Sequence, residues 1–429
     1  MNYTQTLEFL FSSMPSFQEK GVCAYKPGLD RVAAFCRHLG NPQRNYFTIH
    51  VAGTNGKGSV SHMLASILQQ AGYRTGLFTS PHLNDFRERV KVDGKMISKQ
   101  KVVNFVDKHH DKMVELGLSF FEMTTALAFD YFAQCDCEVV VVETGLGGRL
   151  DATNIILPLV SVVTNVGLEH TDLLGDTLPK IAAEKAGIIK KSIPLILGEG
   201  SEEYNAVFEE VAATNKSRVI YAEQTFNVEE RCHDGNKQHF EVTRLRDDHK
   251  YIFDLDLEGD YQWHNVVTAC TVSDFLHEET PLTISRRAFI DGISNVVCET
   301  SLRGRWQTLQ TEPRVICDTG HNAHGLHLVT EQLKGLERDK LYCVIGFVKD
   351  KNIAEILPMF PAEAHYIFTQ AGIERALDAE ELAAKAAEFG LKGEVVREVP
   401  KALARAKELA AAQDVIFVGG STFVVAEVM

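Results

Sequence analysis

The fold of this chain is decided by one stretch, Gly53-Thr54-Asn55-Gly56-Lys57-Gly58-Ser59. Residues 46–51 before it form an apolar run that predicts a buried strand, and apolar residues recur at helical spacing over 60–68 after it. Glycines in such a turn bring backbone N–H groups close to a polyphosphate, and the N-terminus of the following helix adds positive potential. The order of strand, glycine-rich turn and helix therefore predicts a nucleotide-binding loop.

The loop departs from the common G-x-x-x-x-G-K-[ST] pattern. Two residues separate Gly53 from Gly56, and Gly58 stands between Lys57 and Ser59. We expect the lysine to serve the phosphates and the neighbouring hydroxyl to serve a metal ion, as in other phosphate-binding loops. The alternative is a glycine-rich turn with an incidental lysine, which the strand and helix on either side disfavour.

The composition is that of an ordinary globular protein of 429 residues, with 45% hydrophobic and 24% charged residues. This length allows two or three domains, and we expect two. The net charge is −14 and there is no basic run, so we expect neither a nucleic-acid nor a membrane partner. Anionic ligands must then be held by local lysines, arginines and metal ions.

Two features predict a cytoplasmic protein. Residues 1–20 lack the basic start and apolar centre of a signal peptide, and no window approaches the roughly 18 apolar residues of a membrane span. The nine cysteines follow no regular framework, and Cys135-x-Cys137 is too tight for the usual zinc or redox spacing. We expect them to be reduced and mostly packed in the core.

Strands that alternate with helices predict an α/β fold whose first domain is a doubly wound, mostly parallel sheet. The runs 137–142 and 160–165 are typical of strands covered on both faces. Further strands are expected at 74–79 and 194–197, helices at 7–11, 29–39, 99–116, 120–133 and 178–189, a turn-rich segment at 16–28 and a loop at 166–172.

The pattern changes after residue 219. Short alternating segments over 219–257 predict an antiparallel patch attached to the first domain, and helices are expected at 265–276 and 285–296. A second, smaller α/β (Rossmann-like) domain follows. Its strands are expected at 315–317, 341–347, 366–369 and 415–418, and its helices at 326–333, 353–360, 379–389 and 402–412. The expected division is 1–297, a linker at 298–304, and 305–429.

Polar residues follow the strands of the first domain. Ser80, Glu143 and His170 come after successive strands, and Lys185 lies on the helix after His170. Strand ends crowd around the phosphate loop in such a sheet, so Ser59, Ser80 and Glu143 are candidate magnesium ligands, and His170 a candidate ligand of a second ion. Taken singly, each is equally explained as a solvated loop residue or a satisfied histidine.

These motifs together resemble the folylpolyglutamate synthase and dihydrofolate synthase family, ATP-dependent amide-bond ligases of the Mur-ligase superfamily. The resemblance covers nearly the whole chain, with motifs in one order: GTNGKGS, TSPHL (79–83), ETGLGGRLDATN (143–154), TNVGLEH (164–170), EKAGIIK (184–190), GRWQ (304–307) and DTGHN (318–322). The last is similar to the family's D-G-A-H-N. Thr319 and Gly320 depart from it at positions where we expect mainly backbone contact.

The resemblance implies an ATP site that draws on both domains. Lys57 and the amides of Gly53–Ser59 would hold the phosphates, and Asn265, Arg305, Asp318 and His321 would make the remaining ATP contacts. An alternative for Arg305 is a salt bridge within the linker.

The resemblance also implies two magnesium sites. Ser59, Ser80 and Glu143 would serve the first ion, and His170 with a carbamylated Lys185 the second, which makes these last two part of the catalytic set with the loop lysine. Carbamylation turns a cationic amine into a carboxylate that can bind a hard cation. Unmodified, Lys185 would be a phosphate contact or a helix-surface lysine. A monovalent cation is a further candidate ligand.

The acceptor pocket is less sharply defined. By the resemblance, Phe86, Arg87, Asp151 and Ala152 are candidates for the pterin pocket, and Ser421 for a substrate-side serine. Positions in surface loops are the alternative for the first four, and a glycine-rich strand end is the alternative for Ser421.

The implied reaction joins L-glutamate to dihydropteroate, to reduced folates, or to both, through an acyl phosphate, and we expect a bifunctional enzyme acting as a monomer. A single-activity folylpolyglutamate synthase is the first alternative. A cell-wall Mur ligase is disfavoured because only residues 1–45 precede the loop strand. A nucleotide-dependent switch without ligation is the alternative from another class, and Asp318 and His321 argue against it.

Overall fold

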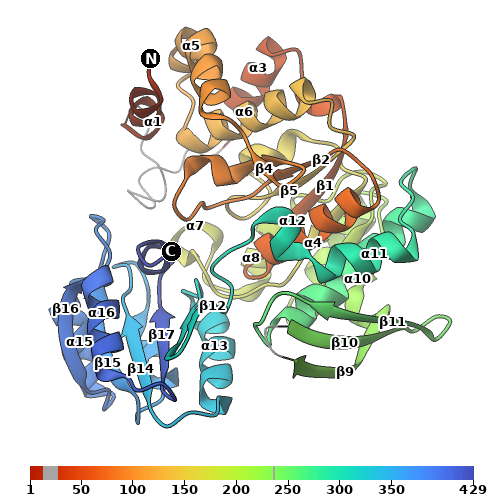
Figure 1. The fold of residues 1–429 in the computed structure, drawn as a ribbon. Helices are drawn as coiled ribbons and strands as arrows, with labels where there is room; N and C mark the ends of the chain where they lie inside the picture. Colours follow the sequence, from red (N-terminus) through yellow and green to blue (C-terminus); the bar gives the residue numbers. More distant parts are fainter. Residues whose placement is uncertain (13–27, 235–236) are drawn as a thin grey trace. The chain divides into compact units, whose positions relative to one another are not determined.

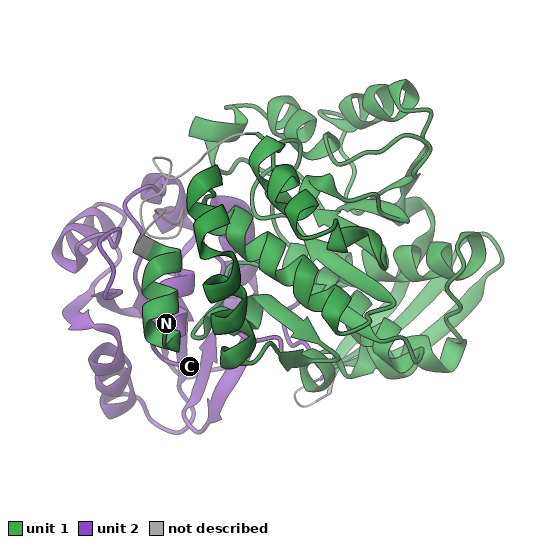
Figure 2. Ribbon diagram, turned by 90° about the horizontal axis from the view of Figure 1, so that it is seen from above, with its two compact units in different colours: residues 1–234, 238–256, 262–301 green, residues 235–237, 257–261, 302–429 purple. Residues whose placement is uncertain are grey.

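A computed structural model describes residues 1–12, 28–234 and 237–429 (Figure 1). The chain divides into two compact units, shown in different colours in Figure 2. Unit 1 contains residues 1–234, 238–256 and 262–301, and unit 2 contains residues 235–237, 257–261 and 302–429. The turn-rich segment expected at 16–28 lies outside the described residues, except for Gly28.

Unit 1 is built on an eight-stranded sheet with the order β4-β3-β2-β5-β1-β6-β7-β8. Its strands are β1 (Phe47–Ala52), β2 (Thr75–Phe78), β3 (Val90–Val92), β4 (Lys95–Met96), β5 (Val139–Glu143), β6 (Val160–Val163), β7 (Leu195–Leu197) and β8 (Val219–Tyr221). The six neighbouring strands β2, β5, β1, β6, β7 and β8 pair in parallel, and β3 and β4 add an antiparallel edge. The predicted parallel sheet is confirmed. The prediction for β8 was wrong, because this segment extends the parallel sheet instead of beginning the antiparallel patch.

Helices cover both faces of this sheet. They are α1 (Tyr3–Ser12), α3 (Asp30–His38), α4 (Lys57–Gln70), α5 (Lys99–Leu116), α6 (Phe120–Gln134), α7 (Thr171–Leu174), α8 (Leu178–Ala186), α9 (Asn205–Thr214), α10 (Gln262–Glu279), α11 (Arg286–Ser294) and α12 (Val296–Thr300). Short 3₁₀ turns are η2 (Pro42–Arg44), η3 (Phe86–Arg89), η4 (Ala152–Ile155) and η5 (Ala222–Gln224). In the described ranges, no helix is long and apolar enough to cross a membrane.

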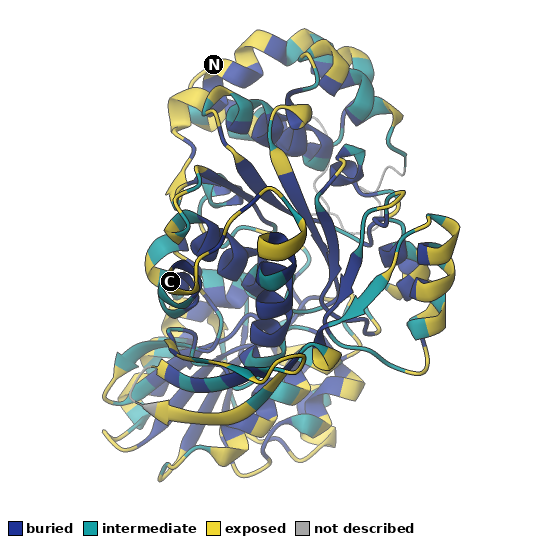
Figure 3. Ribbon diagram, turned by 90° about the vertical axis from the view of Figure 1, so that its right-hand side faces the viewer, coloured by how far each residue is buried: buried dark blue, intermediate teal, exposed yellow. Residues whose placement is uncertain are grey.

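The strand β5 shows why both faces need a cover. Val140 and Val142 join one hydrophobic cluster with residues of α3, α5 and α6. Val139 and Val141 point to the opposite face, because side chains alternate along a strand, and α4 packs against β5, α10 and α11. The helix α4 is therefore buried over most of its length (Figure 3).

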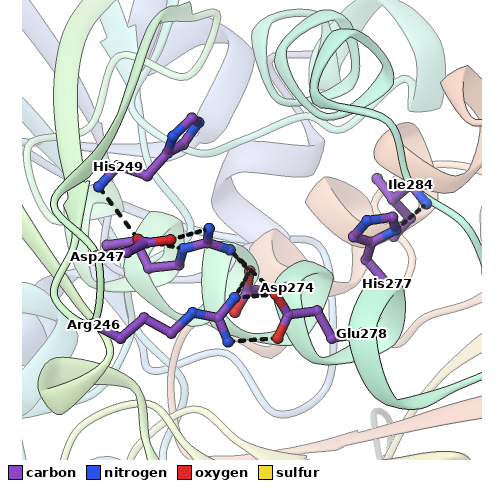
Figure 4. Close-up of polar contacts among 8 residues, drawn as sticks. Arg246, Asp247, His249, Asp274, His277, Glu278 and Ile284 are labelled. Carbon is purple, nitrogen blue, oxygen red and sulfur yellow. Dashed lines mark hydrogen bonds and ion pairs between the residues drawn. The ribbon is translucent and has the colours of Figure 1, made fainter.

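A three-stranded sheet, β11-β10-β9, forms the predicted antiparallel patch of unit 1. Its strands are β9 (Phe226–Asp234), β10 (Lys237–Arg244) and β11 (His249–Leu255), and β10 pairs antiparallel with β11. Two arginines anchor it to α10 (Figure 4). Arg244 pairs with Asp274, and Arg246 pairs with Glu278 and with Asp274 at 3.3 Å. This small sheet is thus tied to the helix that carries Asn265.

Unit 2 contains a six-stranded sheet with the order β12-β13-β17-β14-β15-β16. Its strands are β12 (Gln307–Thr311), β13 (Arg314–Cys317), β14 (Leu341–Ile345), β15 (His365–Gln370), β16 (Gly393–Glu398) and β17 (Val415–Gly419). Its helices are α13 (Ala323–Gly335), α14 (Ile353–Ile356), η6 (Leu357–Met359), α15 (Ala379–Glu388), α16 (Val399–Leu409) and α17 (Thr422–Ala426). Only β12 runs antiparallel to its neighbour. The predicted second α/β domain is confirmed, and its sheet has two edge strands, β12 and β16, that were not predicted. Residues 298–300, expected in a linker, instead end α12.

Gly292 allows α11 to approach α4 closely. A Cβ atom at this position would lie 2.4 Å from the Cα of Ile67, and backbone cannot move aside cheaply. We expect Gly292→Ala to lower the free energy of unfolding by about 3 kcal/mol, measured by calorimetry. Gly335→Ala is the control, because a Cβ there meets nothing within 4 Å and should change stability by less than about 0.5 kcal/mol. Equal melting curves for the two variants would refute this account of the helix contact.

Candidate active site

The carboxyl ends of the central strands of unit 1 meet at one edge of the sheet. In the register of the sheet, Val51 is opposite Glu143, and Phe78 is opposite Val142. The phosphate loop follows β1, Ser80 lies two residues after the end of β2, and Glu143 ends β5. The expected clustering of these strand ends is therefore present in the described structure.

Two glycines of the loop are required by its conformation and by its neighbours. Gly53 has φ of 151°, and a Cβ there would lie 1.8 Å from Oγ1 of Thr164. Gly56 has φ of 80°, and its Cβ would lie 2.2 Å from Oδ1 of Asn265. Side chains from β6 and α10 thus pack directly on the loop, and this places Asn265 beside the predicted phosphate site.

Asn165 holds the middle of the loop. Its backbone oxygen accepts the N–H of Thr54 at 3.0 Å, and its Oδ1 accepts the N–H of Asn55 at 2.9 Å. Its amide group in turn donates to Oε1 of Glu199 at 2.7 Å. The loop is therefore pre-shaped by side-chain contacts from the end of β6, which the sequence motif alone did not reveal.

Lys57 begins α4 and folds back over the loop. Its Nζ donates hydrogen bonds to the backbone oxygens of Gly53 and Thr54, both at 2.9 Å. Gly58 and Ser59 follow in the first turn of the helix, where backbone N–H groups lack helical partners. The hydroxyl of Ser59 is buried and accepts a hydrogen bond from Nε2 of Gln262 at 3.4 Å. This arrangement suits the binding of an anion at the helix N-terminus.

Glu143 and Ser80 provide hard oxygen ligands at this edge. The carboxylate of Glu143 is buried, and its Oε2 accepts the backbone N–H of Ser80 at 3.0 Å. Among the described residues, no group of three or more His, Cys, Asp and Glu side chains gathers as a metal cluster. A set of one carboxylate and serine hydroxyls fits Mg²⁺, which keeps waters and takes substrate phosphates as its remaining ligands.

Lys185, on α8, is a buried cation beside other charges. Burial is the main cause that lowers its pKa to about 7, nearby Lys57 lowers it further, and Glu169 opposes the shift. The side chain is only 2% exposed, so the alternative of a helix-surface lysine is wrong. His170 precedes α7 in the left-handed conformation, and its Nε2 lies 3.8 Å from Oε1 of Glu169. Sequence reasoning missed Glu169, although it sits beside His170 in the TNVGLEH motif.

The pterin candidates occupy different environments. Phe86 is buried and packs against the rings of Phe11 and Phe120, and Ala152 is also buried, so surface-loop positions are excluded for both. Arg87 is partly exposed and pairs with the carboxylate of Asp85 at 2.7 Å.

Asp151 is buried as well, which excludes a surface-loop position. Its carboxylate accepts backbone N–H groups from Gly145, Leu146 and Thr153 at 2.8 to 3.0 Å, and it also accepts the hydroxyl of Thr153. Burial raises the pKa of this carboxyl, and the four hydrogen bonds oppose the shift. The described contacts of Asp151 therefore organise the loop after β5.

The candidates in unit 2 gather after β13. Asp318 is buried, and its Oδ2 accepts the hydroxyl of Tyr261 at 2.6 Å and the backbone N–H of Trp306 at 2.7 Å. Burial raises the pKa of this carboxyl. Nδ1 of His321 lies 2.9 Å from the backbone oxygen of Thr319. Tyr261 is a contact that sequence reasoning missed, because its type and neighbours give no sign of a partner so far along the chain.

Arg305 donates to the side chain of Thr319 and to the backbone oxygen of Gly304 at 3.3 Å. Within the described part of the chain it forms no ion pair, so the linker salt bridge is not seen. The expectation of mainly backbone contact at Thr319 was wrong, because its hydroxyl also donates to Gly304 at 3.0 Å. Ser421 caps α17, since its Oγ accepts the N–H of Phe423 at 3.1 Å.

Two family models match the chain. The Mur ligase middle domain matches residues 51–273, and the Mur ligase glutamate ligase domain matches residues 304–422. A probable bifunctional folylpolyglutamate synthase/dihydropteroate synthase of Haloferax volcanii is 35% identical over 436 residues, which are 100% of this chain and 50% of that protein. This chain thus spans about half the length of that relative.

Two solved structures share the whole fold. E. coli FolC in complex with DHPP and ADP has a TM-score of 0.87 and 31% identity, and the match covers 100% of this chain and 97% of that one. A bifunctional folylpolyglutamate synthase/dihydrofolate synthase with Mn, AMPPNP and L-glutamate bound has a TM-score of 0.84 and 28% identity. That match covers 100% of this chain and 97% of the other chain. The chain therefore belongs to the folylpolyglutamate synthase/dihydrofolate synthase family of the Mur ligases.

Proposed function

We propose that this protein is an ATP-dependent ligase that adds L-glutamate both to dihydropteroate and to reduced folates. The observation that carries the proposal is the edge of the unit 1 sheet, where the phosphate loop, Ser80 and Glu143 meet. The family membership supports it, since related proteins were solved with ADP, AMPPNP and L-glutamate. We also propose that residues 1–297 and 305–429 act as an ATP-binding and a glutamate-ligase domain.

In this proposal the chain holds ATP through residues of each unit. Lys57 exchanges its contacts with Gly53 and Thr54 for phosphate oxygens, and the loop amides support them. Asn265 contacts the nucleotide beside Gly56. In unit 2, Arg305, Asp318 and His321 supply further ATP contacts, and Ser421 contacts substrate.

The metal proposal assigns two magnesium ions. Ser59, Ser80 and Glu143 would hold one, and His170 with the carbamate of Lys185 would hold the other. A bound magnesium ion would neutralise charge on the phosphate oxygens during phosphoryl transfer. A related structure was solved with Mn bound, which supports the binding of a divalent ion. A monovalent cation is proposed as a further bound ion.

The carbamate proposal rests on the surroundings of Lys185. A buried ammonium beside the cation of Lys57 is unfavourable, because two like charges share a region of low dielectric. The ammonium first loses a proton, and the neutral amine then adds carbon dioxide and releases a second proton. A positively charged side chain thereby becomes a negatively charged carbamate. The modified side chain would then attract Lys57 instead of repelling it, and its oxygens suit a hard cation.

The reaction needs no protein nucleophile. A carboxylate oxygen of the acceptor attacks the γ-phosphorus of ATP, the bond to the bridging oxygen breaks, and ADP leaves. The amine of L-glutamate then attacks the carbonyl carbon of the acyl phosphate, and phosphate leaves with the bonding electrons. Lys57 stabilises the charge that spreads over the transferring oxygens. We place the pterin near Phe86, Arg87, Asp151 and Ala152.

We further propose that the enzyme is a cytoplasmic monomer that acts only on small molecules. The cysteines support a reducing compartment, because all eight in the described ranges are free, and five of them are buried. The acidic net charge of −14 supports the absence of nucleic-acid and membrane partners.

The proposal is tested by ADP release in the presence of ATP, magnesium and L-glutamate, with dihydropteroate or tetrahydrofolate as the acceptor. We expect glutamate-dependent release with both, because the same phosphate loop and metal ligands serve either carboxylate. Omission of L-glutamate is the control for simple ATP hydrolysis. Release with only one acceptor would leave a single-activity enzyme, and release with neither would overturn the proposal.

A further inference from the structure

The loop between β2 and β3, residues 79–89, is closed on itself by two of its own residues. The carboxylate of Glu88 accepts the backbone N–H groups of residues 83–85 at 2.7 to 3.2 Å. The backbone oxygen of Arg89 accepts the N–H of Thr79 at 3.1 Å. The loop that carries Ser80 is therefore held in one shape from within.

The guanidinium of Arg89 is buried inside this loop. The residue is 2% exposed, and its Cζ lies 5.2 Å from the ring centroid of Phe120. Its Nε donates a hydrogen bond to Nδ1 of His82 at 2.8 Å. A buried cation is costly unless its donors are satisfied, so these contacts give the guanidinium one well-defined position. Arg89 thereby fixes the ring of His82.

The contact also decides which nitrogen of His82 carries the proton. A guanidinium can only donate, so Nδ1 must be the acceptor, and the proton of the ring lies on Nε2. Within residues 1–12, 28–234 and 237–429, Nε2 has no hydrogen-bond partner. The ring is partly exposed, and it lies 6.3 Å from the rings of Phe11 and Phe86.

We propose that His82 is a further catalytic residue, whose Nε2–H donates a hydrogen bond to the acyl oxygen of the acceptor, and that Arg89 is its positioning residue. This inference rests on the proposed function. His82 lies two residues from Ser80, whose N–H contacts the candidate metal ligand Glu143. Aromatic rings lie near the donor, so of the two proposed acceptors the aromatic carboxylic acid, dihydropteroate, fits best.

A neutral donor at this oxygen would help the step that forms the amide bond. The acyl oxygen stays on the carbonyl carbon while the other carboxylate oxygen bonds to phosphorus. When the glutamate amine adds to the carbon, the carbonyl electron pair moves onto the acyl oxygen, and a fixed N–H stabilises the negative charge there. The pair returns when the bond between carbon and the phosphate oxygen breaks, phosphate leaves with the electrons of that bond, and the glutamate nitrogen loses a proton to solvent. The proton of His82 remains on Nε2 throughout.

The test compares His82→Ala, His82→Gln and the wild type by steady-state ADP release, with dihydropteroate and ATP varied in turn. Loss of one oxyanion donor should lower kcat about 100-fold in His82→Ala, with KM for ATP changed by less than about a factor of two. Glutamine keeps an N–H donor, so kcat of His82→Gln should be at least about tenfold higher than kcat of His82→Ala. His239→Ala is the control for histidine removal, because this partly exposed side chain on β10 pairs only with Asp254, at 2.8 Å, among the described residues.

A wild type without glutamate-dependent release would overturn the proposed function itself. With an active wild type, the inference about His82 fails if His82→Ala stays within about threefold of it, or if glutamine is as poor as alanine. Arg89→Gln tests the positioning role. We expect it to lower kcat, and we expect His82→Ala to cost little more in that background, since the two residues act as one unit. Additive losses would refute the coupling, and the His82 pair stands if Arg89→Gln does not fold.

Discussion

Replacement of Lys57 by alanine should abolish ligase turnover while the protein stays folded. Among the described residues, the hydrogen bonds of the side chain go to backbone oxygens of its own loop at 2.9 Å, and the residue is only partly buried, so little core packing is lost. The lost cation would otherwise offset charge on the transferring phosphoryl oxygens, an effect worth about 100- to 1,000-fold in kcat. ADP release with saturating dihydropteroate and L-glutamate measures the loss, and a thermal melt measures the fold.

Lys180→Ala is the matched control for this variant. Lys180 is an exposed lysine on α8 that pairs with Asp176 at 2.8 Å, and a surface pair of this kind contributes little to stability. We expect activity and melting temperature close to those of the wild type. Lys57→Ala activity equal to that of Lys180→Ala would refute the assignment of the phosphate loop.

The second large effect concerns Lys185. Lys185→Ala should lower turnover by at least about 100-fold, because it removes a carboxylate ligand if the amine is carbamylated. It also leaves a space beside Lys57 and Glu169 in which a small anion fits. Added acetate or propionate should therefore restore part of the activity. The measurement is ADP release against the concentration of the acid.

Lys57→Ala provides the control for rescue, because a carboxylate cannot replace a missing cation. We expect no recovery of this variant at any acid concentration. If Lys185→Ala is equally indifferent to short acids, the carbamate is wrong, and the side chain is better explained as an unmodified phosphate contact.

The sequence revealed most of the sheet because its central strands are covered on both faces. Runs such as 139–142 consist of β-branched residues, and a strand of this composition is recognised without any partner in view. The sequence analysis did not predict the strands β3, β4, β12 and β16. The last two are the edge strands of the unit 2 sheet, half-exposed and mixed in composition. Lys91 of β3 is a buried lysine whose Nζ donates to the backbone oxygen of Thr300 at 2.7 Å.

The residues of the candidate site also fall into those that the sequence predicted and those that only the structure revealed. Residues within one motif, such as Gly53 and Lys57, are close because they are near in sequence, so the motif predicted them directly. Glu169, Arg89 and Tyr261 matter through burial and through partners elsewhere in the chain. A charged or polar residue type gives no sign of burial, so these contacts emerged only from the three-dimensional structure.

The segment 257–261 has a consequence for dividing this protein into fragments. It belongs to unit 2, although unit 1 residues flank it on both sides of the sequence. Glu258 pairs with Arg314 at 3.2 Å, and Tyr261 donates to Asp318. A fragment that starts at Leu302 would lose both partners and leave the buried carboxylate of Asp318 short of a donor. A C-terminal fragment is therefore incomplete without residues 257–261, and a single cut in the sequence cannot separate the two units.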